Sequence, residues 1–168
     1  MAIFHEISPE ELRDNPFHLF DKEWTLITAE HAGKVNMMTA SWGGLGIMWH
    51  KPVAYIAIRP QRFTKTLVDA EEHLSLCFFD ESYRKELAFC GRNSGKDVDK
   101  IAECHFTVAH ENQVPYFDEA RMVLVCRKLF AQPYDKESFL DKSILTKDYA
   151  AEDYHTFYIV EIEKILVK

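Results

Sequence analysis

Alternating and continuous apolar segments predict strands at both ends of the chain. Alternation over residues 23–29 and 35–42, on either side of the polar segment 30–34, predicts a β-hairpin whose turn spans 30–34. The unbroken apolar run 52–59 is typical of a buried strand. Alternation over 156–167 predicts a long strand near the carboxyl end, and shorter segments predict strands at 74–79 and 122–130.

Apolar residues with helical spacing lie between the strands. They predict helices at 63–72, 83–89 and 98–103, with Gly91 placed as a glycine at the end of the second helix. Near the start, Ser8-Pro9-Glu10-Glu11 has the pattern of a capping box, which predicts a short helix that Asn15-Pro16 ends.

Residues 43–46 hold three of the six glycines in the chain, which predicts a loop where the backbone bends or approaches another group closely. Strands that dominate both ends, with helices inserted between them, indicate a mainly β fold. We therefore expect a β-barrel with inserted helices.

Length and composition favour one folded domain over residues 1–168. The 47% of apolar residues and 13% of aromatic residues are enough for a core and favour strands with a ring-lined pocket. The formal charge of −7 argues against binding to nucleic acid or to an anionic membrane surface. Residues 1–6 lack the features of a signal peptide and no apolar run is long enough to span a bilayer, so we expect a cytoplasmic protein.

The cysteines and histidines predict no metal site. Cys77, Cys90, Cys104 and Cys126 contain no C-x-x-C spacing, and without a secretion signal they are expected to be reduced thiols, mostly in the core. The eight histidines include no H-E-x-x-H pattern.

The segment Arg59-Pro60-Gln61-Arg62-Phe63-Thr64-Lys65-Thr66 lies where a strand leads into a helix. Its three cations, two hydroxyls and first-turn backbone N–H groups favour an anion, and a phosphomonoester fits that chemistry. A solvated basic turn, capped by Arg62 or Thr64, explains the same residues about equally well.

Two further segments have the composition of a binding site. In the strand Asn36–Trp42, alternate residues face opposite sides, and a strand that ends in small hydroxyl residues can offer backbone groups to a flat heterocycle. An ordinary half-buried strand is the alternative. The polar loop Cys90–Lys100 suits closure over a ligand or a partner subunit, although by itself it is typical of a surface loop and lacks the spacing of a phosphate-binding P-loop.

In this order the segments resemble the flavin reductase-like family with the FMN-binding split barrel, particularly its flavoredoxin-like branch. The resemblance covers roughly residues 20–168. The residues that carry it are Asn36–Trp42, Trp49-His50-Lys51-Pro52, Arg59–Thr64, Cys90-Gly91 with Ser94–Lys100, and Tyr154-His155-Thr156-Phe157.

The resemblance implies a split barrel of Greek-key type and a homodimer with FMN near the subunit interface. Residues 38–42 would line the isoalloxazine ring, and a basic cluster would hold the phosphate. The implied cofactor-binding residues are Met38, Thr39, Ala40, Ser41, Trp42, Arg59, Arg62, Thr64, Lys65, Gly91, Ser94 and His155.

Three functions remain open from the sequence. The first is a flavoprotein oxidoreductase that passes hydride from NAD(P)H to FMN and onward to an acceptor. The second is an electron-transfer protein that keeps FMN bound, serves a redox protein partner and has no nicotinamide site. The third is a binding or structural module without flavin turnover.

One departure from the resembled family bears on the choice. Relatives that use NAD(P)H often carry Gly-Asp-His near the last strand, where this chain has Glu152-Asp153-Tyr154-His155. This departure argues against use of a pyridine nucleotide and leaves the expected binding of flavin unchanged. His155 is a candidate for a catalytic role in positioning a nicotinamide or the flavin edge, and a hydrogen-bonded structural histidine is the alternative.

Overall fold

The computed structural model describes residues 3–168, so Met1 and Ala2, part of the segment inspected for a targeting signal, lie outside the described residues. The prediction of a mainly β fold is confirmed. The strands are β1 (His5–Ile7), β2 (Thr25–His31), β3 (Lys34–Ala40), β4 (Gly43–Met48), β5 (Lys51–Ile58), β6 (His73–Phe78), β7 (Val108–Glu111), β8 (Val114–Phe117), β9 (Met122–Pro133) and β10 (Thr156–Val167).

Eight of these strands form one antiparallel sheet. Its order is β3-β2-β6-β9-β10-β5-β4, with β1 paired to β10, while β7 and β8 form a separate hairpin. Strand β3 therefore lies at one end of the hydrogen-bonded series. Its backbone, together with the connection that follows it, is open to whatever packs beside it.

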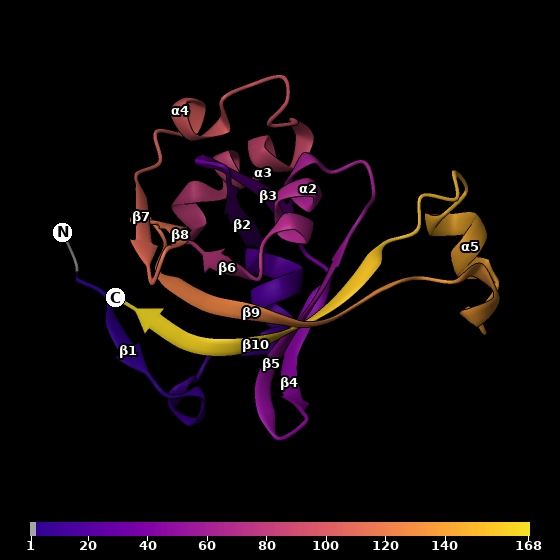
Figure 1. Ribbon diagram of the computed structural model, residues 1–168, viewed down its shortest axis with the longest axis horizontal. Helices are drawn as coiled ribbons and strands as arrows, with labels where there is room; N and C mark the ends of the chain where they lie inside the picture. The colour runs from indigo at the N-terminus through magenta and orange to yellow at the C-terminus, as the bar shows by residue number, and fades with distance from the viewer. Residues whose placement is uncertain (1–2) are drawn as a thin grey trace.

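The helices gather mostly at one end of the sheet. They are α1 (Pro16–His18), α2 (Phe63–Ala70), α3 (Arg84–Arg92), α4 (Lys100–Cys104) and α5 (Ser143–Asp148). Figure 1 shows α2, α3 and α4 together above β2 and β3. The segment 134–155, which carries α5 and which we call the arm, projects away from them between β9 and β10 (Figure 1).

Two clusters of buried side chains lie on the sheet's two faces. One contains residues of β2, β5, β6, β9 and β10 together with Leu67 and Val68 of α2. The other packs α3, α4 and the β7–β8 hairpin against the opposite side, through Leu87, Cys90 and Cys104 among others. All four cysteines are free and buried, as expected from their spacing. The alternation in β3 follows from this arrangement, because Met38 belongs to the first cluster and Met37 to the second.

The β2–β3 hairpin confirms the predicted strand pair but not the five-residue turn at 30–34. His31 pairs with Lys34, so the turn is only Ala32-Gly33, and both residues have positive φ. The same kind of turn, at Trp49-His50, joins β4 to β5. Two-residue turns with positive φ match the right-handed twist of the strands, which is why the strands continue farther than the polar residues suggested.

The predicted loop at 43–46 is wrong, since these glycines begin strand β4. A Cβ on Gly43 would lie 2.5 Å from the Tyr55 carbonyl oxygen and 2.7 Å from the Phe20 ring. On Gly46 it would lie 3.1 Å from the Tyr55 ring. Close approach does require glycine here, as predicted, but the group that approaches is the protein's own strand β5 and an aromatic ring of the core.

Several helix boundaries also differ from the prediction. Gly91 lies inside α3, which continues to Arg92, instead of ending the helix. The predicted first helix is only a 3₁₀ turn at Pro9–Glu11, although its capping box forms and the Ser8 N–H donates to Glu11 at 2.7 Å. Strand β1, the β7–β8 hairpin and helix α5 were not predicted, because each is too short to show a periodic pattern.

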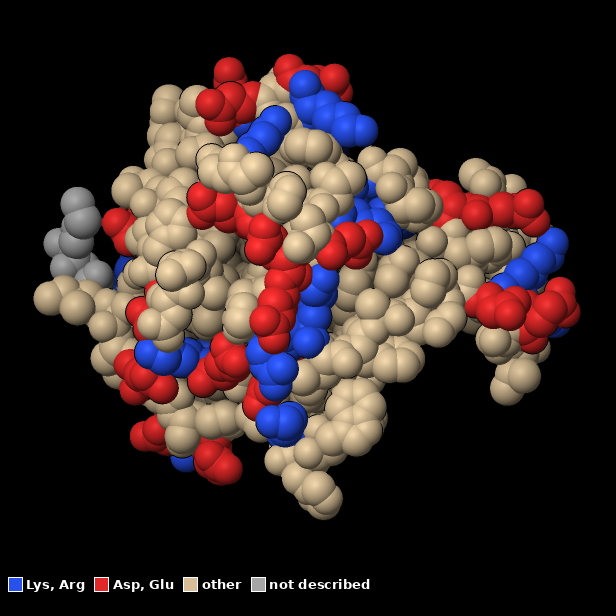
Figure 2. Space-filling model, viewed as in Figure 1, with Lys and Arg blue, Asp and Glu red and all other residues tan. Residues whose placement is uncertain are grey.

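Charged side chains of both signs are interspersed over the face of the sheet seen in Figure 2. Across β5, β9 and β10, Glu161 accepts from Lys51 and from Arg127, both at 2.8 Å. These ion pairs connect the three strands on this face.

Candidate functional site

Two cavities that share wall residues lie where β3 ends. The strand-end cavity, about 190 Å³, is lined by Met38, Thr39, Ala40, Ser41, Trp42, Ala57, Arg59, Arg62 and His155. The loop cavity, about 130 Å³, is lined by Asn36, Met38, Gln61, Arg62, Phe63, Thr64, Gly91, Arg92, Asn93, Ser94, Gly95 and Lys100. Met38 and Arg62 belong to both, so the two cavities adjoin.

Every cofactor-binding residue implied by the sequence except Lys65 lines one of these cavities. Lys65 was expected to join Arg59 and Arg62 around one anion. Instead its ammonium pairs with Asp69 at 2.6 Å and lies 6.0 Å from the Tyr158 ring, away from both cavities. Lys65 is on α2, so the turn of the helix directs its side chain toward Asp69, four residues on.

The end of β3 contributes consecutive residues to the strand-end cavity. Strand β3 stops at Ala40, and beyond it Ser41 and Trp42 leave the regular pleat, so residues of both faces reach the cavity. Trp42 is half exposed, at 50%. The Thr39 hydroxyl donates to the Leu87 carbonyl at 2.5 Å and so fastens β3 to α3. Because the Thr39 hydroxyl already donates its hydrogen to Leu87, it can act toward a ligand only as a hydrogen-bond acceptor.

Arg62 lines both cavities, and only one of its two terminal guanidinium nitrogens has a hydrogen-bond partner in the described chain. Its Nη1 donates to the Gly91 carbonyl at 3.0 Å. Its Nη2 is buried and has no hydrogen-bond partner among residues 3–168. Burial lowers the pKa of Arg62, because the charged form loses water without gaining a carboxylate. A buried, unpaired guanidinium N–H is costly unless an acceptor occupies the cavity.

Thr64 lies in the first turn of α2, just after Arg62. It is buried, and its hydroxyl oxygen accepts a hydrogen bond from the Asn36 amide at 2.8 Å. Arg62, Phe63 and Thr64 together line the loop cavity where α2 begins. First-turn N–H groups have no acceptor within their helix, so this wall favours negative charge.

The loop after α3 forms the opposite wall. The Ser94 hydroxyl accepts from the Lys96 N–H at 3.2 Å and shapes the turn. A Cβ on Gly95 would lie 2.1 Å from the Asn36 side-chain oxygen, so only glycine lets this loop approach β3. The Cys90–Lys100 segment is therefore packed against the cavity rather than extended into solvent.

The sequence did not single out Lys100, a further residue of the loop cavity. Its side chain is buried at 3% exposure and its ammonium donates to the carbonyls of Met37 and Cys90, the latter at 3.2 Å. Burial, reinforced by nearby Arg62, lowers the pKa of Lys100 to about 8. No periodic pattern marks it, because the tertiary contact with β3 and α3 is what buries it. Asn36, Arg92 and Asn93 are other wall residues that were not among the implied cofactor-binding residues.

Arg59 lines the strand-end cavity but is engaged by the arm. Its guanidinium pairs with Asp153 at 2.8 Å, donates to the Asp148 carbonyl at 3.0 Å and lies 5.0 Å from the Tyr149 ring. The neighbouring Gln61 donates to Asp153 at 2.9 Å. Arg59 therefore fixes the base of the arm, with its charge already matched by a carboxylate.

His155 closes the strand-end cavity from the arm side. Its Nδ1 lies 2.6 Å from the Tyr149 hydroxyl, and its ring lies 5.2 Å from the Trp42 ring. Burial, together with the charge of Arg59, lowers the pKa of His155 to about 4. The imidazole is consequently neutral at physiological pH, and it presents an uncharged aromatic edge to the cavity.

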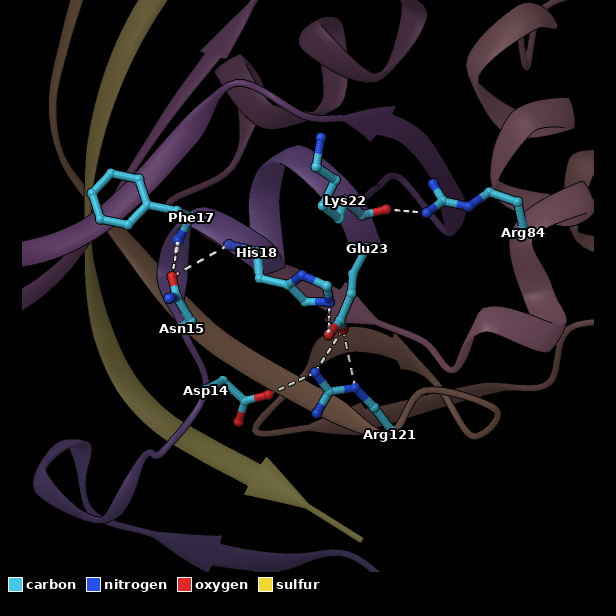
Figure 3. A network of polar contacts seen from close by, with 8 residues as sticks. All are labelled: Asp14, Asn15, Phe17, His18, Lys22, Glu23, Arg84 and Arg121. Carbon is cyan, nitrogen blue, oxygen red and sulfur yellow. Dashed lines mark hydrogen bonds and ion pairs between the residues drawn. The ribbon is translucent and has the colours of Figure 1, made fainter.

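A third cavity, of about 350 Å³, provides a contrast, and Figure 3 shows the polar contacts of several residues that line it. It also has basic walls, but Arg121 pairs with Asp14 at 2.7 Å and with Glu23 at 2.6 Å (Figure 3). Arg84 lies over the Trp24 ring and donates to the Lys22 carbonyl. Its lining contains as many carboxylates as arginines and lysines, so its charge is balanced.

Unlike the third cavity, the loop cavity has an excess of positive charge in its wall. Its described lining includes three cations, Arg62, Arg92 and Lys100, and no carboxylate, in a chain whose net charge is −7. Unbalanced positive charge concentrated in a recess is the electrostatic signature of a site for an anion. The adjoining strand-end cavity is flanked by aromatic and small side chains, which suits a flat ring.

The fold and the cavities define a mainly β protein with a basic, carboxylate-free recess at the end of its edge strand. Residues 17–168 match the family model for the flavin reductase-like domain, and the chain belongs to that family. No match was found among curated proteins.

Solved structures with a similar fold include redox proteins. Flavoredoxin from Methanosarcina acetivorans is 21% identical with a TM-score of 0.68, over 87% of this chain and 68% of that one. An FMN-binding domain of flavin reductase-like enzymes from Shewanella baltica is 12% identical with a TM-score of 0.72, over 98% and 77%. The styrene monooxygenase flavin reductase from Pseudomonas putida is 15% identical with a TM-score of 0.62, over 85% and 77%. At these identities the likeness concerns the fold.

Within residues 3–168, each helix is too short or too polar to cross a membrane.

Proposed function

We propose that this chain is an FMN-binding flavoprotein oxidoreductase, with the isoalloxazine ring in the strand-end cavity and the phosphate in the loop cavity. The observation that carries the proposal is Arg62, a side chain that lines a recess without carboxylates and whose buried Nη2 has no partner in the described part of the chain. A phosphate oxygen is the acceptor that this group lacks. The two adjoining cavities, one flanked by rings and one basic, match the two ends of FMN.

The proposed roles of the wall residues follow from their positions. Arg62, Lys100 and the first turn of α2 would hold the phosphate, with Ser94 at the rim. Residues 38–42 would lie beside the ring and offer backbone groups to its polar edge. Trp42 and His155 would border the ring's exposed side.

Bound FMN would supply the redox chemistry, accepting a hydride from NAD(P)H and passing electrons to an acceptor. The side chains of this protein would bind and orient the cofactor and exclude water from it. His155, kept neutral by burial and held by Tyr149, would place no positive charge beside the ring. Among the lining residues of the strand-end cavity no carboxylate is available as a general base. The proposed hydride transfer requires none.

An electron-transfer protein without its own nicotinamide site is the second candidate. It is favoured by the observation that Asp153, the acidic residue of the segment 152–155, is occupied by Arg59 and Gln61 and so is not free to orient a nicotinamide. From the arm, His155 also lines the strand-end cavity, which leaves less room for a second planar ligand.

Absorbance spectra of the freshly purified protein test the proposal and separate the two candidates. Flavin bands that co-purify, or that shift when FMN is added, are the expected result. Anaerobic bleaching of those bands by NADH or NADPH would identify a reductase. Bleaching only by a chemical or protein reductant would identify the electron-transfer protein. Failure to bind either FMN or riboflavin would refute both.

We further propose that the sheet closes into the split barrel and that two copies form a homodimer. Met38 of β3 and Ala57 of β5 line the same cavity, although their strands lie near opposite ends of the sheet order, which supports closure. Ile47 and Trp49 at the β4–β5 tip are 69% and 53% exposed, and Phe130 lies beside Trp49. Exposed apolar residues grouped in this way favour an interface. Sedimentation showing a monomer at micromolar concentration would contradict the dimer.

A further inference from the structure

Lys100 is a buried cation whose hydrogen bonds are only partly made. It leaves the first turn of α4 and reaches between β3 and α3, where the Met37 and Cys90 carbonyls accept from its Nζ. Lys100 is only 3% exposed, yet it lines the loop cavity. A lysine placed this deeply normally has a carboxylate partner. In the described chain, no carboxylate lies within ion-pair distance of the Lys100 ammonium.

The number of donors on Nζ gives this arrangement two states. A neutral amine has two N–H groups, and both are satisfied by the two carbonyls. An ammonium has three, so its third N–H needs another acceptor. Lys100 lines the loop cavity and also a neighbouring cavity of about 420 Å³ whose wall includes Asp97 and Asp99. An anion in the loop cavity would provide the missing acceptor.

The charged and titratable groups around Lys100 do not supply it. Asp97 and Asp99 share the neighbouring cavity with Lys100, but in the described chain neither forms an ion pair with it, and Asp99 instead accepts from the Ala102 N–H at 3.1 Å. Arg62, from the connection before α2, repels the ammonium, and Arg92 lies on the same cavity wall. Cys90 of α3 and Cys104 of α4 are buried thiols whose pKa values are raised by burial, Cys90 to about 12. They therefore remain neutral thiols around pH 8 and cannot compensate the charge.

We propose that Lys100 is a proton-linked specificity residue of the phosphate site, whose ammonium form is stabilised by a phosphate dianion in the loop cavity. The inference rests on the proposed function and deepens it, since it states how the cavity distinguishes a phosphorylated flavin from riboflavin. The ligand chemistry required is a terminal phosphomonoester, which carries two negative charges above its second pKa near 6.

The consequence for pH dependence has a definite sign. Without ligand the pKa of Lys100 is lowered to about 8, and a bound dianion raises it again. Binding of FMN must then take up protons above pH 8 and take up almost none at pH 7. At pH 8.5, a group with a pKa of about 8 is roughly three quarters deprotonated, so binding would take up about 0.75 of a proton. The affinity for FMN would fall by up to about tenfold for each pH unit above that.

Titration calorimetry on the full chain at pH 8.5, in two buffers with different ionisation enthalpies, measures this uptake directly. We expect FMN to take up about 0.75 of a proton and riboflavin close to none. FMN bound without uptake, or equal uptake with riboflavin, would overturn the inference and leave the proposed function intact. If neither flavin bound, the proposed function and the inference would both fail.

Two substitutions assign the proton to Lys100. Lys100→Arg keeps the charge but does not titrate in this range, so a folded variant would bind FMN without uptake. Lys100→Met would lose the uptake and lower the preference for FMN over riboflavin, while Arg62 would keep part of that preference. Lys65→Met is the matched control, because Lys65 is a partly buried lysine paired with Asp69 outside the cavity. Uptake that persisted in either folded Lys100 variant would overturn the inference, and the comparison of flavins in the wild-type protein decides it if neither variant folds.

Discussion

Replacing Arg62 by alanine removes a charged side chain that lines both cavities. In the described chain this charge is not paired with a carboxylate. In the free protein Arg62 makes one hydrogen bond, to the Gly91 carbonyl at 3.0 Å, and leaves Nη2 without an acceptor. The substitution therefore removes a contact to α3 but also removes a buried charge that is unfavourable without ligand. Because these two effects oppose each other, we expect the unfolding free energy of the free protein to change by no more than about 1 kcal/mol.

The effect on ligand affinity is expected to be larger. A hydrogen bond from a charged donor contributes about 1.5–3 kcal/mol. At about 1.4 kcal/mol for each factor of ten, Arg62→Ala should weaken FMN roughly 10- to 100-fold. Riboflavin lacks the phosphate, so its affinity should change by less than about threefold. The ratio of the two losses isolates the phosphate contact from any rearrangement of the ring site.

Fluorescence titration with both flavins measures these affinities, and thermal unfolding checks that the variant is folded. Lys65→Ala is the matched control, since it removes a cation from the same helix start without touching either cavity. It should leave both affinities within about twofold of the wild type. Equal losses for FMN and riboflavin in Arg62→Ala, or an equally large loss of FMN in Lys65→Ala, would refute the assignment of the phosphate to the loop cavity.

Three other predictions follow from the geometry. Gly43→Ala should lower the unfolding free energy by about 1–3 kcal/mol, because its Cβ would overlap neighbouring atoms, whereas Gly44→Ala, with its nearest contact at 3.9 Å, should be nearly neutral; chemical denaturation compares them. The pKa of His155 is about 4 in the folded protein and 6.5 in an unfolded chain, so the unfolded chain takes up the proton at the higher pH. The unfolding free energy, measured by chemical denaturation, should therefore fall by up to about 3 kcal/mol as the pH is lowered from 6.5 to 4, and His155→Gln should reduce that fall. Ser41→Leu should abolish flavin binding in a folded protein, and FMN should quench Trp42 fluorescence in the wild type; a folded variant with unchanged affinity would remove Ser41 and the segment that follows β3 from the site.

The parts of the site that local sequence patterns determine were predictable. Alternation placed Met37 and Met38 on opposite faces of β3, and the two methionines do lie in different cores. The helix start near Phe63 was visible from the change of strand to helical spacing, which located Arg62 and Thr64 correctly at the beginning of α2. These features depend on residues within a few positions of one another.

Features that depend on distant residues were not predictable. Arg59 was assigned to the phosphate because of its neighbours, but its partner Asp153 comes from the arm. Lys100 was part of a segment with the composition of a surface loop, and only its insertion between β3 and α3 buries it. Gly43 was expected to open a loop, since the sequence does not show that a ring and a carbonyl group need its space. In each case a tertiary contact decides the role.

The attachment of the arm has a consequence for how relatives of this protein can diverge. Strands β9 and β10 stay paired from Met122–Val167 to Pro133–Thr156, and the arm begins only beyond that last pair. Residues can therefore be inserted into or removed from the arm without shifting the register of either strand. The floor of the site, built from β3 and the start of α2, would be inherited unchanged. Changes in the arm would alter what reaches the exposed side of the strand-end cavity, while the walls built from β3 and α2 would stay the same.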